Sequence, residues 1–196
     1  MSKASNKEKF SYEKERSSMF FLHEKVVYPG HGVAKINRIV EKKVSGKTVQ
    51  FFELSFLNKD MTILIPTETI AQTGIRGLST VKHIRDMLQM LSVPSNKGIQ
   101  ELTSANWNKR NKEYQLRLRS GNLREIGKVY QDLKCISQYK ELSFGEKNLL
   151  HQTEVLLAQE ISIVNKVEEN KAIEYLRSFF SSGECTKAKN HVASLM

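Results

Sequence analysis

The chain has 196 residues, of which 39% are hydrophobic, 27% charged and 8% aromatic, and it contains only three prolines and ten glycines. This is a globular composition, and the length allows one large domain or two small ones. The formal net charge is +10, so the surface should attract polyanions, nucleic acid first and anionic membrane second. No run approaches the ~20 apolar residues of a transmembrane helix, which excludes a membrane-spanning protein.

The N-terminal segment and the cysteines bear on the cellular compartment. Residues 1–19 mix lysines and glutamates with serines and contain no apolar stretch of the signal-peptide kind, so we expect a disordered extension and no anchor. The two cysteines, Cys135 and Cys185, lie far apart in unrelated contexts. We therefore expect no disulfide framework and a reducing, cytoplasmic setting.

Residues 20–72 have the pattern of short strands joined by tight turns. The first strand runs into Pro29-Gly30-His31-Gly32, where two glycines can take positive φ. Residues 48–56 are rich in β-branched and aromatic side chains, and the run 61–65 stops at Pro66, a residue of strand ends and edges. Four or five such strands predict a small barrel of SH3 or Tudor type, because closure hides the edges.

From Ser79 onward the apolar residues recur with helical period. Thr80 is the expected N-cap of a first helix that ends before Pro94, and the polar stretch 95–103 is predicted to be a loop. Further helices are predicted over 106–120, from 122 onward, from the Ser-x-x-Glu capping box at 143–146, and over 168–180. The predicted fold class is α+β in two domains, a barrel over 20–75 and an all-α domain over 79–182, followed by a flexible tail at 183–196.

The sequence offers little for catalysis. No serine or cysteine lies in a nucleophile context, no glycine-rich loop fits a phosphate-binding template, and the five histidines lack metal-ligand spacing. We predict a protein that is not an enzyme and that uses no cofactor, metal or small-molecule substrate.

Basic residues concentrate between Asn106 and Lys140. This segment holds nine lysines and arginines against three acids, a net charge of +6, which is more than half that of the chain. Charge runs are usually solvated helix faces. Because few acids neutralise this one, a surface that follows a phosphate backbone is the competing interpretation.

The single tryptophan, Trp107, lies at the start of this basic segment. Tyr114 and Leu118 fall on nearly the same helical face, so periodicity favours burial as a core anchor. A tryptophan in a first helical turn, followed by Lys109 and Arg110, also has the pattern of an apolar wedge for a DNA groove with phosphate clamps. The sequence leaves both interpretations open.

Several motifs together resemble one family. They are Lys25-Val-Val-Tyr-Pro-Gly-His-Gly-Val33, Ile63-Leu-Ile-Pro66, Gly74-Ile-Arg76, Asn106-Trp-Asn-Lys-Arg110 and Leu142-Ser-Phe-Gly-Glu-Lys147. In this order they resemble the CarD/CdnL family of bacterial transcription regulators, over about 21–164. Members of that family join a Tudor-like barrel, which binds the β subunit of RNA polymerase, to a helical domain that binds DNA at the upstream edge of the transcription bubble.

The resemblance implies roles for particular residues. Trp107 would be the minor-groove wedge, with Lys109, Arg110 and the neighbouring Lys112 at phosphates. Leu64 and Pro66 match positions that face polymerase, and Lys42 stands where some relatives have arginine. The implied function is stabilisation of the open promoter complex, largely independent of base sequence, by a cytoplasmic, nucleoid-associated protein.

Two other functions are open at this stage. One is an RNA-binding assembly protein in which the basic helices bind structured RNA and the Tudor-like module mediates assembly. The other is a Tudor-type reader of a methylated cation, with a cage built from Tyr28, Phe51, Phe52 and Phe56. Alternation places Phe52 and Phe56 on one face with Leu54, which is the pattern of a barrel core and disfavours the cage.

Overall fold

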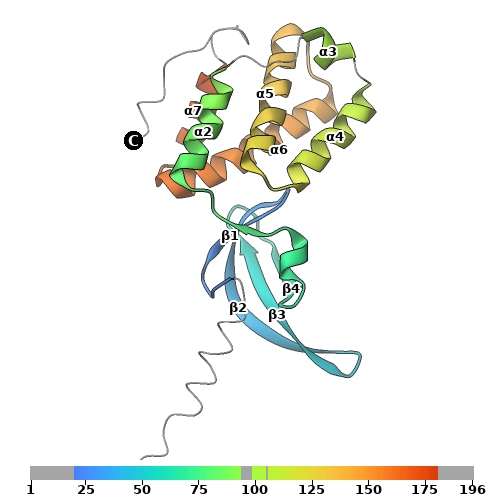
Figure 1. Cartoon of the computed structure of the whole chain (residues 1–196), viewed down its shortest axis with the longest axis vertical. Coiled ribbons are helices and arrows are strands. Elements are labelled where there is room, and N and C mark those ends of the chain that lie inside the picture. Colours follow the sequence, from blue (N-terminus) through green and yellow to red (C-terminus); the bar gives the residue numbers. More distant parts are fainter. Residues whose placement is uncertain (1–19, 94–98, 105, 181–196) are drawn as a thin grey trace, which may run out of the picture. The chain divides into compact units, whose positions relative to one another are not determined.

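The computed structural model describes residues 20–93, 99–104 and 106–180 (Figure 1). The chain divides into two compact units. One comprises Val33–Ile75 with the described residues up to Val26, and the other comprises Val27–Gly32 and the chain from Arg76 onward. The predictions of a disordered extension at 1–19 and a flexible tail at 183–196 lie outside the described residues.

The predicted short strands are present and form one five-stranded sheet in the order β4-β3-β2-β1-β5. They are β1 (Lys25–Tyr28), β2 (Gly32–Val44), β3 (Lys47–Phe56), β4 (Thr62–Pro66) and β5 (Arg76–Gly77), with a 3-10 helix, η1 (Ile70–Thr73), before β5. β3 pairs antiparallel with both β2 and β4. Within the described ranges β4 and β5 are the sheet edges, so closure into a barrel stays a prediction.

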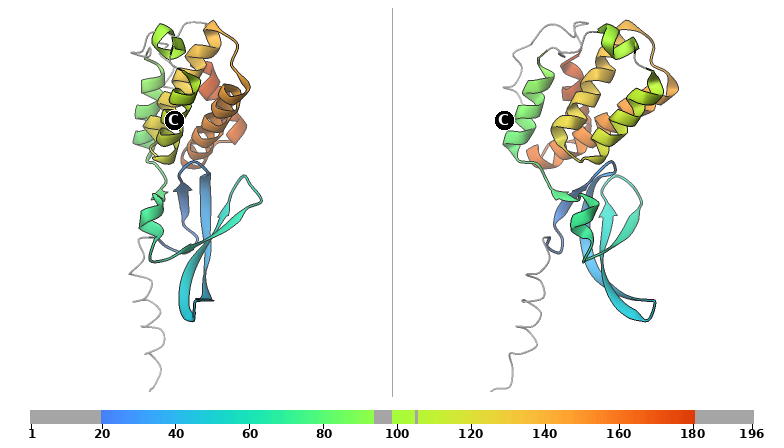
Figure 2. Two further views of the ribbon diagram at one scale, coloured as in Figure 1. Left: turned by 90° about the vertical axis from the view of Figure 1, so that its right-hand side faces the viewer. Right: turned by 45° about the vertical axis from the view of Figure 1, so that its right-hand side comes forward.

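β2 and β3 form a long, curved two-stranded ribbon (Figure 2). Its turn consists of Ser45 and Gly46 with φ of 52° and 79°, the two positive values that a hairpin turn matching the strand twist requires. A bulge between Ile36 and Arg38 changes the register along β2. Phe52 is 1% exposed and lies in the core with Leu54. It therefore cannot line an open aromatic cage.

The helical unit follows the predicted order with one addition. Its helices are α2 (Val81–Leu91), α3 (Ile99–Ser104), α4 (Trp107–Arg119), α5 (Leu123–Tyr139), α6 (Phe144–Asn165) and α7 (Glu169–Ser178). The prediction of a loop over 95–103 is wrong from Ile99 onward, where α3 begins. Leu102 of α3 is buried in a small cluster with Cys135, Ile136 and Leu142, and this burial stabilises a helix too short to form alone.

Helix starts agree closely with the sequence. The capping box at the start of α6 is confirmed, because the Ser143 side chain accepts from the Glu146 backbone and Glu146 accepts in return from the Ser143 backbone. Asn122 caps α5 by accepting from the backbone of its first turn. Glu125 in the same turn accepts a 2.6 Å hydrogen bond from Lys128.

α6 carries a feature that hydrophobic periodicity does not reveal: three buried glutamates. Each pairs with an arginine from a different element, namely Glu146 with Arg110 of α4, Glu154 with Arg177 of α7, and Glu160 with Arg76 of β5. The Glu154 and Glu160 pairs have N–O distances of 2.6 Å. α6 is thus tied by ion pairs to three other parts of the helical unit.

Cys135 is buried in α5 and is disulfide-bonded. The sequence predicted no disulfide framework and a reducing setting, so this bond departs from that expectation. No helix in the described part of the chain is both long and apolar enough to cross a membrane.

Candidate nucleic-acid interface

Trp107 is the first residue of α4, and its side chain is partly buried against the main core of the helical unit. A Cβ built on Gly145 would lie 3.0 Å from the indole Cζ2, so the ring rests directly on the first turn of α6. The guanidinium carbon of Arg110 lies 5.6 Å from the ring centroid, within cation–π range. The ring is therefore anchored and retains an accessible part, so the core and the wedge interpretations of Trp107 both stay predictions.

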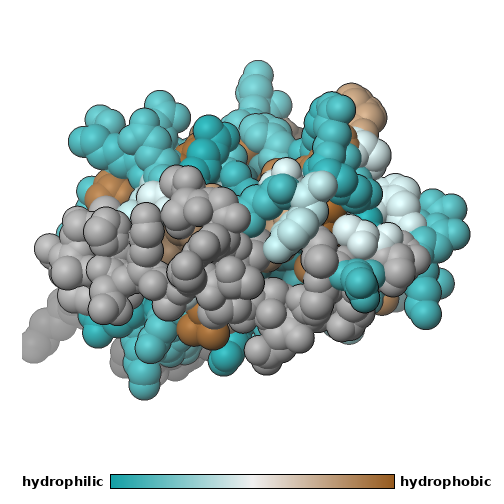
Figure 3. Space-filling model, turned by 90° about the horizontal axis from the view of Figure 1, so that it is seen from above, coloured by the Kyte–Doolittle hydropathy of each residue, from teal (hydrophilic) through white to brown (hydrophobic). Residues whose placement is uncertain are grey.

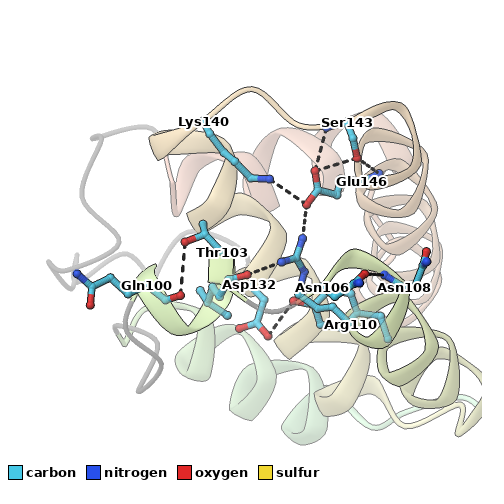
Figure 4. Close-up of polar contacts among 11 residues, drawn as sticks. Gln100, Thr103, Asn106, Asn108, Arg110, Asp132, Lys140, Ser143 and Glu146 are labelled. Carbon is cyan, nitrogen blue, oxygen red and sulfur yellow. Dashed lines mark hydrogen bonds and ion pairs between the residues drawn. The ribbon is translucent and has the colours of Figure 1, made fainter.

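Arg110 is buried, with 6% of its surface exposed. Its Nη2 donates to Glu146 Oε1, and its Nη1 donates to the Leu102 carbonyl at 2.5 Å (Figure 4). A phosphate would have to displace Glu146 to reach this guanidinium. The location corrects the expectation that Arg110 is a phosphate clamp; Arg110 instead holds Trp107 and Glu146 in place.

Glu146 is the centre of this network. Its Oε2 accepts from the Ser143 backbone and hydroxyl at 2.9 Å each, and Lys140 Nζ lies 3.5 Å from Oε1. Burial by itself would raise the pKa of Glu146. The hydrogen bonds from Ser143 and the charges of Lys140 and Arg110 outweigh burial, so the pKa is lowered. The carboxylate is therefore ionised at neutral pH and can hold Arg110.

The outer face of α4 is different. Lys109, Lys112, Leu116 and Arg119 follow one another at spacings of three or four residues and are all exposed or half-exposed. Neither Lys109 nor Lys112 forms an ion pair within the part of the chain that the structure describes. Both lysines are thus available to a phosphate backbone.

Two exposed aromatic residues that the sequence analysis did not single out lie where α5 ends and α6 begins. Tyr139 is the last residue of α5 and is 60% exposed, and Phe144 is the first of α6 and is 80% exposed. The available signal was the place of Phe144 next to its N-cap and outside the apolar stripe of α6. In Figure 3, which views the molecule from above, the coloured surface is largely hydrophilic and its apolar residues form separate small groups.

The three residues expected to face polymerase share one face of the sheet. Leu64 pairs with Glu53, Pro66 with Phe51, and Lys42 with Val49. These β3 positions alternate with the buried Phe52 and Leu54, so all three partners lie on the opposite, outer face. Leu64 and Pro66 are half-buried and Lys42 is exposed.

A metal centre has no support in the described ranges, where no group of His, Cys, Asp and Glu could hold an ion. The helical unit presents a partly exposed indole and exposed lysines, and the sheet unit separately presents the half-buried Leu64 and Pro66 on an edge strand.

The comparisons with known proteins define the class as a transcription regulator built from two domains. Residues 22–79 match the CarD-like/TRCF RID domain, and residues 88–177 match the CarD C-terminal domain. The chain belongs to the CarD family, as the sequence motifs predicted. It is 24% identical over 153 residues to the "Putative transcription factor YdeB" of Bacillus subtilis (strain 168), covering 78% of this chain and 97% of that protein.

Proposed function

We propose that this protein binds the RNA polymerase β subunit through the outer face and edge of its sheet. We further propose that it binds promoter DNA at the upstream edge of the transcription bubble through α4, and so stabilises the open complex. The observation that carries the proposal is the indole of Trp107, fixed between Gly145 and Arg110 and still partly exposed, beside the exposed Lys109 and Lys112.

The proposed mechanism is a shift of equilibrium. Polymerase opens promoter DNA reversibly, and a ligand that prefers the open state shifts the balance by its differential affinity for the two states. Stacking of an aromatic ring on a base contributes about 1–3 kcal/mol, which would lengthen the life of the open complex roughly 5- to 150-fold. A ring that is already held in place loses little conformational freedom on binding.

The DNA contact would depend on shape and charge. Lys109 and Lys112 reach phosphates, which carry no sequence information, and the ring reads a distorted junction rather than base edges. Arg110 acts as a positioning residue for Trp107. The contact is therefore expected to vary little with promoter sequence.

The polymerase contact would combine side chains and main chain. Leu64 and Pro66 lie on the outer face beside the half-buried Phe51 and form an apolar patch there, while Glu53 and Lys42 add charges on the same face. Within the described sheet β4 has a strand partner on one side only, as a strand-addition site requires.

The test uses the full chain and purified polymerase. Leu64→Glu should abolish capture of the β subunit while the circular dichroism spectrum stays unchanged, because a charge replaces a half-buried apolar contact. Gln89→Glu adds the same charge at an exposed position of α2 and should bind normally. Undiminished binding by Leu64→Glu would remove this residue from the interface, and partners that disappear after ribonuclease treatment would favour the RNA-binding alternative.

A further inference from the structure

Phe144 is the most exposed of the large apolar side chains in the described structure, at 80%. It belongs to neither buried cluster of the helical unit, so its ring adds little to the stability of the fold. It directly precedes Gly145, the residue on which the Trp107 indole rests. The exposed phenyl ring therefore lies one residue from the base of the proposed wedge.

Two lysines and two glutamates flank Phe144, and the two lysines keep exposed side chains. Lys140, just after α5, is 44% exposed although its Nζ lies 3.5 Å from the buried Glu146, and Lys147, in the first turns of α6, is 55% exposed. Lys147 forms a 2.7 Å ion pair with Glu141, but both partners are exposed, and exposed pairs contribute little to stability. Lys147 can therefore exchange Glu141 for a phosphate at little cost.

This arrangement selects among possible occupants. A protein partner of apolar character needs a continuous apolar surface, whereas the exposed rings of Tyr139 and Phe144 are separated by two charged residues, a serine and the buried Leu142. Aromatic rings interleaved with lysines are typical of surfaces that bind single-stranded nucleic acid by stacking and charge. In a closed duplex the base faces are already stacked, so only an unpaired strand offers them.

We propose that Phe144 and Trp107 form a two-ring stacking surface for an unpaired strand of opened promoter DNA, with Lys140 and Lys147 at its phosphates. This proposal rests on the proposed function and extends it, because it assigns the α5–α6 junction to the melted strand. With two rings, this surface could stack more than one base.

The experiment measures fluorescence anisotropy of the full chain with two DNA probes, a blunt duplex and a duplex of the same length with one unpaired arm. Phe144→Ala should weaken binding to the forked probe about 5- to 150-fold, the range for loss of one stacked base, and leave the blunt duplex unaffected. Phe144→Trp should keep or strengthen fork binding. Val81→Ala is the matched control, since Val81 is also an exposed apolar residue of the helical unit and lies in α2, outside the proposed DNA-binding surface.

Each other result overturns the proposal in a recognisable way. Equal fork affinity for Phe144→Ala and Val81→Ala would exclude a stacking role for Phe144, while faster open-complex decay by Trp107→Ala would still uphold the proposed function. If Phe144→Ala lowered the melting temperature by several degrees, the ring would stabilise the fold and its effect on DNA binding would follow from unfolding. Tighter binding to an RNA arm of the same sequence would overturn the assignment to DNA.

Discussion

The inner and outer faces of α4 both carry basic residues, but these residues have different surroundings. On the inner face, Arg110 is buried against Glu146, and Tyr114 donates to Asp132 at 3.4 Å. On the outer face, Lys109 and Lys112 are accessible and form no ion pair with described residues. The net charge of residues 106–140 therefore includes a buried arginine that stabilises the fold and exposed lysines that are accessible at the surface. The net charge alone does not distinguish these two kinds of residue.

Removing the partner of the inner arginine should have the largest effect. Glu146→Ala leaves Arg110 buried without its counter-charge, which typically costs about 3–5 kcal/mol. A denaturant titration of the full chain measures the free energy of unfolding. Glu141→Ala, which breaks an exposed pair, should leave the free energy of unfolding nearly unchanged. If the two variants lowered the free energy of unfolding equally, the buried pair would contribute no more to stability than the exposed pair.

Trp107 spans the two faces, so its removal should affect both stability and function. Truncation of a fully buried tryptophan costs about 3–5 kcal/mol, and for this partly buried ring we expect roughly half of that. Open complexes should also decay faster with polymerase binding intact. The melting temperature and the decay rate of open complexes measure the two effects. A lower melting temperature with an unchanged decay rate would show that Trp107 is only a core residue.

Replacing the outer lysines should leave the fold intact. With Lys109 and Lys112 both changed to alanine, the log–log salt dependence of DNA binding should flatten by about 0.9 for each phosphate that the protein no longer neutralises. Lys171→Ala, at an exposed position of α7, is the control and should keep the original slope. An unchanged slope for the double variant would make the outer face an ordinary solvated surface.

The inner carboxylates should make stability depend on pH. The pKa of Glu154, like that of Glu146, is lowered: burial would raise it, but hydrogen bonds from Arg177 and Tyr130 outweigh burial. The stabilisation is therefore fully present above the unfolded-state pKa of about 4.3 and is lost as pH falls through the lower folded values. Urea midpoints between pH 6 and pH 3 measure this loss, and Glu154→Gln should reduce its steepness. A midpoint independent of pH would contradict the ion pairs.

Interactions between residues close in the sequence were predicted correctly. The features that were not predicted depend on residues far apart in the sequence. The capping box at Ser143 and the N-cap at Thr80 depend on residues a few positions apart, and the structure contains both. The partner of Arg110 lies 36 residues away, so nothing near Arg110 indicates burial. α3 is short and polar, and it depends on Leu102 packing against residues that follow much later in the chain.

Because the Trp107 indole packs directly on Gly145, the size of the residue at this position affects where the ring lies. Its backbone lies in a helix that tolerates alanine, yet a single methyl group there would meet the ring at 3.0 Å, tighter than ordinary van der Waals contact. Gly145→Ala would favour the helix and at the same time push the tryptophan outward by a few tenths of an ångström. In the proposed function, the reach of the indole into DNA would therefore depend on the absence of a methyl group at Gly145 of α6.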